Sequence, residues 1–244
     1  MTAALAVLGV AIVVALVLLA ARGRGHRRSR RALPAELPEG WLDLGVLPVP
    51  YGRHRALPRM LSAYLDPAAT RFANAVRHAR TCLVLDAVPH GRGVVFVHAG
   101  PCAPDAPWAA SNLALALAQL GPVLLVHDPE GPALDDTEAT DAAAPRDGGA
   151  ARTWPQGMID LLRCEAGSLP DAATVDGEWA RYEWVVVQGE CAAALAGAGT
   201  LQRDGLVHVS LYAGAEQLRD VVAGAAADAG SGEHARAVLG VAEE

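Results

Sequence analysis

Two short apolar runs with a helical segment between them constrain the fold most. Gly93–His98 and residues 122–127 are unbroken apolar runs of the kind that is buried on both faces of a parallel sheet. Between them a loop over 99–107 leads into 108–120, where alanine and leucine recur at helical spacing. The order strand, loop, helix and strand predicts a βαβ unit, which winds right-handed into a parallel sheet.

The rest of the chain continues this alternation. Further strands are predicted at 184–187, 205–211 and 237–241, and helices at 65–80, 156–163, 190–197 and 215–229. The helix over 65–80 is expected to start with Asp66 as N-cap and Pro67 in its first turn. The acidic segment 135–152 is rich in alanine and glycine and is expected to be mobile. We therefore expect one doubly wound α/β domain over residues 66–244, with a mostly parallel sheet of roughly five strands.

A membrane anchor is predicted before this domain. Residues 3–21 carry no charge and are nearly all Ala, Val, Leu and Ile, long enough as a helix to cross most of a hydrocarbon core of ~30 Å. A cleaved signal peptide would need positive charge before the run, but only residues 1–2 precede it. Six arginines follow it instead: Arg22, Arg24, Arg27, Arg28, Arg30 and Arg31. The positive-inside rule then predicts a single-pass protein with residues 1–2 outside and the globular domain in the cytoplasm.

Charge divides the chain into two parts. The basic juxtamembrane segment 22–31 has the composition that binds anionic lipid. Beyond it, 14 arginines face 27 acidic residues, a formal charge of −13, which argues against a nucleic-acid partner. The segment 32–65 is expected to be a linker because its prolines break any long helix. The four cysteines form no C-x-x-C pair and are expected to be reduced.

Residues 93–132, GVVFVHAGPCAPDAPWAASNLALALAQLGPVLLVHDPEGP, resemble the ATPase core of the bacterial tyrosine kinases that partner capsule and exopolysaccharide export. These kinases are relatives of the MinD/ParA group of P-loop ATPases. The strongest match is 112–119 followed by Gly121 and 123–126, and the predicted strands at 182–187 and 204–209 support it. The resemblance implies a P-loop ATPase-like fold and a tether to the bacterial inner membrane. It also implies a polysaccharide co-polymerase or export machinery as partner.

The same resemblance places a degenerate phosphate loop at Ala103, Pro104, Asp105, Ala106, Pro107 and Trp108. The family's glycine, lysine and serine or threonine fall on Asp105, Ala106 and Pro107. Asp105 repels phosphate, Ala106 carries no charge, and Pro107 has neither a hydroxyl nor a backbone N–H. The chain contains no lysine at all, so a shifted alignment cannot supply one, and arginine is a poor substitute in such a loop.

Two further motifs of the family are also degenerate. The acidic motif after the second strand falls on His127, Asp128 and Pro129, and the Mg²⁺-binding aspartate falls on Gln188. We therefore predict no catalytic residue, no nucleotide cofactor and no metal. We predict instead that the protein acts as a scaffold or regulator of polysaccharide biosynthesis or export. One alternative is an atypical ATPase or tyrosine kinase of that pathway, which would bind ATP and Mg²⁺ through backbone amides. Another is a MinD/ParA-like positioning protein.

Three other hypotheses concern single features. Strand ends could gather two histidines and two cysteines into a tetrahedral zinc site, although their spacing matches no metal motif and packing is the favoured interpretation. The residues concerned are His98, Cys102, His127, Asp128, Gln188, Glu190 and Cys191. Trp108 could fill the vacant phosphate pocket. The family's oligomerisation helix, with a glutamate and arginines at three-residue spacing, falls on Thr70, Ala73 and Val76. Arg77 and Arg80 keep that spacing only in a shifted register, so ring assembly of the family type is not expected.

Overall fold

The computed structural model describes nine stretches of the chain: residues 37–49, 61–88, 93–98, 106–127, 152–154, 159–164, 179–189, 205–227 and 235–242. They belong to one compact unit that starts at Leu37. The predicted membrane span and the arginines at 22–31 lie outside these stretches. Among the described helices, none is both long enough and apolar enough to span a bilayer.

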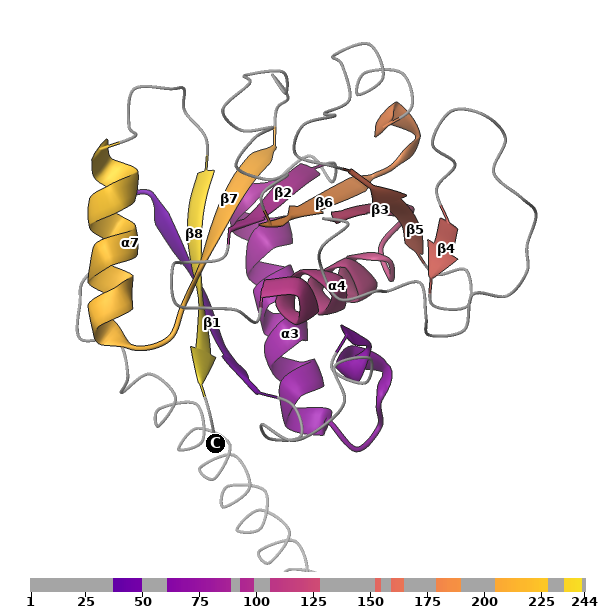
Figure 1. The fold of residues 1–244 in the computed structure, drawn as a ribbon, viewed down its shortest axis with the longest axis horizontal. Helices are drawn as coiled ribbons and strands as arrows, with labels where there is room; N and C mark the ends of the chain where they lie inside the picture. Colours follow the sequence, from indigo (N-terminus) through magenta and orange to yellow (C-terminus); the bar gives the residue numbers. More distant parts are fainter. Residues whose placement is uncertain are drawn as a thin grey trace, which may run out of the picture. The chain divides into compact units, whose positions relative to one another are not determined.

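An eight-stranded sheet forms the centre of the unit, in the order β1-β8-β7-β2-β6-β3-β5-β4 (Figure 1). Seven strands are parallel, and only β4, at one edge, runs antiparallel to its neighbour β5. The strands are β1 Trp41–Pro48, β2 Gly93–His98, β3 Val123–His127, β4 Arg152–Trp154, β5 Ile159–Arg163, β6 Trp184–Gln188, β7 Leu206–Tyr212 and β8 Ala235–Ala242. The predicted α/β class with a mostly parallel sheet is confirmed, but the described sheet has eight strands and not about five.

Three α-helices are described: α3 Thr70–Cys82, α4 Ala106–Leu117 and α7 Ala215–Ala227. α3 continues into a π-helical turn, η3 Leu83–Ala87, and two 3-10 turns are η2 Ala63–Leu65 and η5 Trp179–Arg181. α4 follows β2 and leads to β3, which confirms the predicted βαβ unit. α3 and α4 pack side by side, and α7 packs against β7 (Figure 1).

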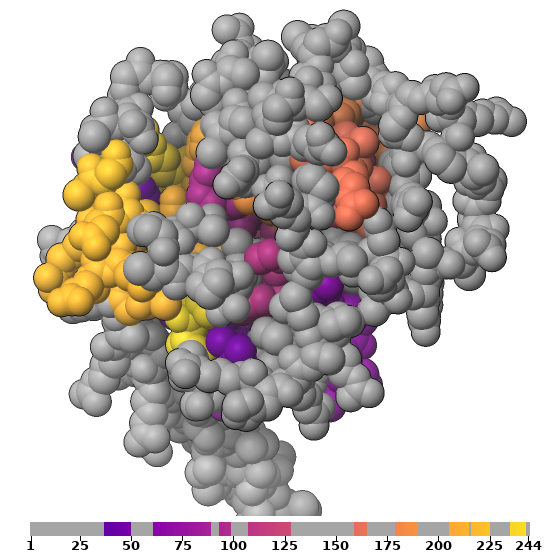
Figure 2. All heavy atoms as spheres, in the orientation of Figure 1, coloured from indigo at the N-terminus to yellow at the C-terminus, as the bar shows by residue number. Residues whose placement is uncertain are grey.

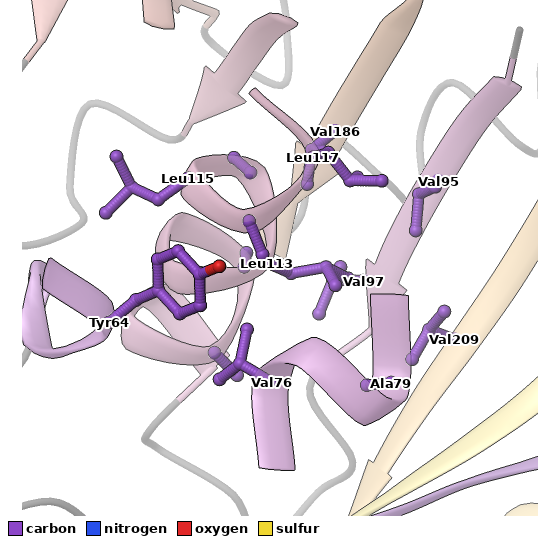
Figure 3. Packing of buried hydrophobic residues seen from close by; sticks show 14 of the residues in the cluster. Tyr64, Val76, Ala79, Val95, Val97, Leu113, Leu115, Leu117, Val186 and Val209 are labelled. Carbon is purple, nitrogen blue, oxygen red and sulfur yellow. The ribbon is translucent and has the colours of Figure 1, made fainter. Parts of the chain in front are cut away.

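Apolar side chains form two clusters because successive residues of a strand point to opposite faces of the sheet. The larger cluster joins Val95 and Val97 of β2 to Leu113 and Leu117 of α4, and α3 closes it from the side (Figure 3). The smaller cluster contains Phe96 and other side chains of the opposite face. β2 is buried on both faces, as its apolar run predicted.

The expectation that 32–65 is only a linker is wrong, because Trp41–Pro48 is strand β1 and pairs in parallel with β8. Leu44 and Leu47 are buried by this pairing. The strand is interrupted: Gly45 has a φ of 88°, and the register shifts between Asp43 and Val46. Such a bulge at a sheet edge hides the alternation by which a strand is recognised in sequence.

The predicted helix at 156–163 is also wrong, because Ile159–Arg163 is strand β5, held between β3 and β4. Burial of Ile159 and Leu161 follows the two-residue period of a strand. The helix predicted at 65–80 begins later, at Thr70. The Asp66 carboxylate accepts the Ala68 N–H (2.7 Å), so it caps a preceding turn. The helix predicted at 190–197 lies outside the described residues, as does 135–152 except for Arg152 in β4.

Candidate functional site

The candidate site lies where α4 begins, beside the carboxyl ends of β2, β3 and β6. α4 starts at Ala106, so Ala106 and Pro107 are its first two residues. In a phosphate-binding loop these positions face the ligand with backbone N–H groups, a cation and a hydroxyl. Proline is tolerated in a first helical turn, but it offers none of those groups.

Trp108 is the next residue, and its side chain is completely buried. Its ring lies 5.8 Å from the ring of Phe72 in α3, within the larger apolar cluster. The indole Nε1 has no hydrogen-bond partner among the described residues, and the ring packs against apolar side chains. Trp108 therefore anchors the start of α4 to α3. Trp108 was also predicted to fill a vacant phosphate pocket. That pocket would be formed by the loop 99–105, which lies outside the described part of the chain, so this stays a prediction.

Two buried polar residues tie α4 to the segment before α3. The Ser111 hydroxyl donates to the carbonyl oxygens of Leu61 (2.9 Å) and Trp108 (3.1 Å). The Asn112 amide donates to the Trp108 carbonyl (2.6 Å), and its Oδ1 accepts the backbone N–H of Tyr64 (2.7 Å). The strongest sequence match to the family starts at Asn112, but the hydrogen bonds of its side chain could not be predicted from the sequence. These polar groups stabilise the helix start and are not offered to a ligand.

Gln188 and His127 lie next to each other on the face of the sheet that α4 covers. Val126 pairs with Val187, so the following residues, at the ends of β3 and β6, share a face. Both side chains are buried, and Gln188 is only 3% exposed. Within the described stretches, the Gln188 Oε1 atom has no hydrogen-bond partner. A neutral amide in a desolvated position thus stands where the resemblance places a metal-binding carboxylate.

These residues do not fit ATP and Mg²⁺ bound in the way the resemblance implies. Mg²⁺ prefers carboxylate, hydroxyl and water oxygens, and phosphates need a nearby cation. At the start of α4 and the ends of β3 and β6, the described side chains include those of Pro107, Trp108, His127 and Gln188, and none of these is a carboxylate or a hydroxyl. The Ser111 hydroxyl, one turn into the helix, is buried and donates to protein carbonyl groups. Ala103, Pro104, Asp105, Asp128 and Pro129 lie outside the described residues.

A histidine pair occupies the opposite face of the sheet. One imidazole N–H donates to the other ring across 3.0 Å between His98 Nε2 and His208 Nδ1, and the ring planes differ by 7°. The Phe96 ring lies 5.2 Å from the ring of His208. Burial lowers the pKa of His98 below its usual 6.5. His208 was not singled out from the sequence, although its place between Val207 and Val209 in a strand would have put it on this face.

The register of β2 against β6 argues against the zinc hypothesis. Gln188 pairs with Val97, so it shares a face with Val97, whereas His98 points to the other side of the sheet. His98 and His127 are therefore separated by the sheet itself. Within the described residues no three His, Cys, Asp or Glu side chains could hold a metal ion. Cys102, Asp128, Glu190 and Cys191 lie outside the described stretches.

The described tyrosines do not offer their hydroxyl groups to solvent. Tyr64, Tyr182 and Tyr212 are all buried. Tyr182 donates to Asp160 (2.7 Å), and burial, followed by this carboxylate, raises its pKa to about 12. Burial and the nearby Asp43 also raise the pKa of Tyr212 to about 12. A phosphate acceptor would have to be accessible, which these three side chains are not.

Comparison with solved structures identifies the fold. The kinase domain of Escherichia coli tyrosine kinase ETK superimposes with a TM-score of 0.52 at 15% sequence identity, over 86% of this chain and 96% of that one. The chimerical protein CapA2B2 gives a TM-score of 0.53 at 15% identity, over 82% and 94% of the two chains. No protein-family model matches the chain, and no curated protein matches it by sequence. The chain has the fold of the bacterial tyrosine kinase domains.

Proposed function

We propose that this protein is a membrane-anchored relative of the bacterial tyrosine kinases that does not transfer phosphate. It acts as a scaffold or regulator of polysaccharide synthesis or export in the bacterial inner membrane, with the co-polymerase or export machinery as its partner. It uses neither a nucleotide nor a metal. Residues 3–21 anchor it, and the arginines at 22–31 fix its orientation and contact anionic lipid.

The start of α4 carries this proposal. Ala106, Pro107 and the buried Trp108 stand where a phosphate loop needs a lysine, a hydroxyl and free N–H groups. The chain has no lysine anywhere, so no other segment can supply the missing ammonium. Gln188, with an unpartnered Oε1, replaces the metal-binding carboxylate. Losing three separate requirements of the same reaction is more informative than losing any single one.

Nucleotide binding is the direct test. The full chain in lipid nanodiscs is titrated with ATP and Mg²⁺ by calorimetry and incubated with radiolabelled ATP, and the ETK kinase domain serves as the positive control. We expect no binding up to millimolar ATP and no label on the protein. Micromolar affinity would refute the proposal and favour the atypical nucleotide-binding enzyme.

The scaffold role needs a test in cells. In a strain lacking the protein, we expect Gln188→Ala to restore polysaccharide output as well as the unchanged chain does, since no metal is bound there. Removal of residues 1–31 should abolish the restoration because it removes the anchor. If polysaccharide output does not depend on the protein, the pathway assignment fails even where nucleotide binding is absent.

A further inference from the structure

α3 has a charge pattern unlike the rest of the unit. Among the described α-helices it alone carries arginines without any acidic residue on the helix, although the chain beyond residue 31 is strongly acidic. Arg77 is exposed and donates to the Asn74 side chain (2.6 Å). Arg80 donates to the Gln119 side chain (2.8 Å) and to the Ala116 carbonyl (3.3 Å). Within the described part of the chain these two guanidinium groups contact neutral acceptors and no carboxylate.

Two exposed leucines follow directly, in the chain, the residues that contact these arginines. Gln119 Oε1 accepts from both the Tyr64 hydroxyl and Arg80, at 2.8 Å each, so η2, α3 and the end of α4 meet at one point. Leu65 follows Tyr64 and is 42% exposed, and Leu120 follows Gln119 and is 47% exposed. The guanidinium of Arg77 lies 5.8 Å from the centre of the Tyr64 ring. We call Leu65, Arg77, Arg80 and Leu120 the arginine–leucine patch.

We propose that the arginine–leucine patch docks the globular unit on the anionic surface of the membrane that anchors the chain. Arginine beside exposed leucine is the pairing that binds at lipid headgroups, where the cation meets phosphate and the apolar side chain enters the interface. The chain beyond residue 31 has a formal charge of −13, so an anionic leaflet favours a face that presents arginines without acidic residues. Atoms of the 61–88 segment reach the surface at the lower right of Figure 2, while α7 forms the left side.

Lipid is favoured over a protein partner by the size of the patch. A stable protein interface takes about 20–30 residues from each side, whereas this patch has three exposed side chains and the half-buried Arg80 around one polar contact. A weak contact is enough when the chain is tethered, because the tether raises the local concentration of the surface. Nine residues separate Arg31 from Trp41, and they span at most about 30 Å. The inference therefore rests on the membrane anchoring in the proposed function.

The test measures whether lipid shields the leucines. The full chain is placed in nanodiscs of phosphatidylcholine alone or with about a third of phosphatidylglycerol, and hydroxyl-radical oxidation of Leu65 and Leu120 is followed. We expect oxidation at least about fivefold slower in the anionic discs, reversed in 0.5 M salt because surface charges are then screened. Equal rates in both discs overturn the proposal, as do slow rates that depend on protein concentration, which indicate a second copy as the occupant.

Two variants distinguish docking through the patch from an effect of the overall charge of the protein. Arg77→Glu changes the charge by two and is expected to weaken docking about 30-fold, since each charge beside an anionic leaflet contributes roughly fivefold. Among the described residues, the Arg77 side chain contacts only Asn74 and the Tyr64 ring, so the substitution is expected to leave the fold intact. Arg219→Glu on α7, also exposed, is the matched control and should leave both oxidation rates unchanged. If the control acts as strongly as Arg77→Glu, the surface is not specific and the proposal fails.

Failure of docking can be told apart from failure of the anchor. If residues 3–21 do not span a bilayer, the chain will not stay in the discs of phosphatidylcholine alone during purification, because these discs offer no anionic lipid to hold the arginines. If the chain stays in the discs and both leucines oxidise equally fast in the two lipids, the anchor holds and only the docking is wrong. Nucleotide binding is measured separately and affects neither outcome.

Discussion

Gln188→Met is the most direct probe of the desolvated amide at the end of β6. Gln188 is 3% exposed, and in the part of the chain that the structure describes its Oε1 has no partner. A buried acceptor without a partner costs about 1–3 kcal/mol, and methionine has a similar length and shape without that oxygen. We expect the free energy of unfolding to rise by about 1 kcal/mol, the lower end of that range, because the substitution also removes the amide NH₂. For a unit of this size the melting temperature should rise by about 2–4 °C.

Urea unfolding of the full chain in detergent micelles measures this change. All five tryptophans lie beyond residue 36, so their fluorescence reports on the globular unit and not on the predicted anchor. A higher urea midpoint with an unchanged slope indicates a change in stability alone. Gln119→Met is the matched control: its Oε1 accepts from Tyr64 and Arg80, so the same substitution should lower stability. A loss of more than about 1 kcal/mol in Gln188→Met would show that Oε1 has a partner, such as a bound ion or water, and would refute the reasoning.

Three further predictions use the same unfolding assay. Asn112→Ala should cost about 2 kcal/mol, because it leaves the buried Tyr64 N–H without its acceptor and removes one of the donors to the Trp108 carbonyl, whereas Ser111→Ala should cost about 1 kcal/mol. The contribution of neutral His98 to the free energy of unfolding should be complete above pH 6.5. It should be lost as the pH falls from 6.5 through the lowered pKa of the folded state, because the unfolded chain then binds more protons. His98→Asn should make the free energy of unfolding depend less on pH in this range. Tyr212→Phe should raise stability at neutral pH, because the buried hydroxyl has no partner, and should reduce the loss of stability between pH 10 and about 12.

The centre of the sheet could be predicted from the sequence, but its edges could not. β2 and β3 are buried on both faces, so each is an apolar run that needs no information about its neighbours. β5 shows only two buried side chains, and its strand conformation depends on β3 and β4 beside it. β1 pairs with β8 at the far end of the chain, a partner that no local pattern indicates. Both β1 and β5 were therefore missed because their strand conformation depends on partners that are distant in the sequence.

The candidate site could be located from the sequence, but its two faces could not be distinguished. The predicted loop over 99–107 places Ala106 two residues before a helix, and the predicted strand over 184–187 places Gln188 directly after a strand. Which strand ends share a face depends on register, and a shift by one residue moves a side chain to the other side of the sheet. Gln188 pairs with Val97, so it lies away from His98, which the sequence had grouped with it. The contact between His98 and His208 could not be predicted, because it depends on β7 lying next to β2.

The same register argument predicts what Ala106→Lys can and cannot restore. A lysine at the first residue of α4 would supply one charge near the phosphate position. Pro107 would still lack an N–H and a hydroxyl, and Gln188 would still hold a neutral amide on the face that α4 covers. We therefore expect calorimetry to detect no ATP binding by Ala106→Lys. If this single substitution produced micromolar, Mg²⁺-dependent binding, the rest of the cradle would be intact, and the protein would be one charge away from an enzyme and not a scaffold that has lost the whole site.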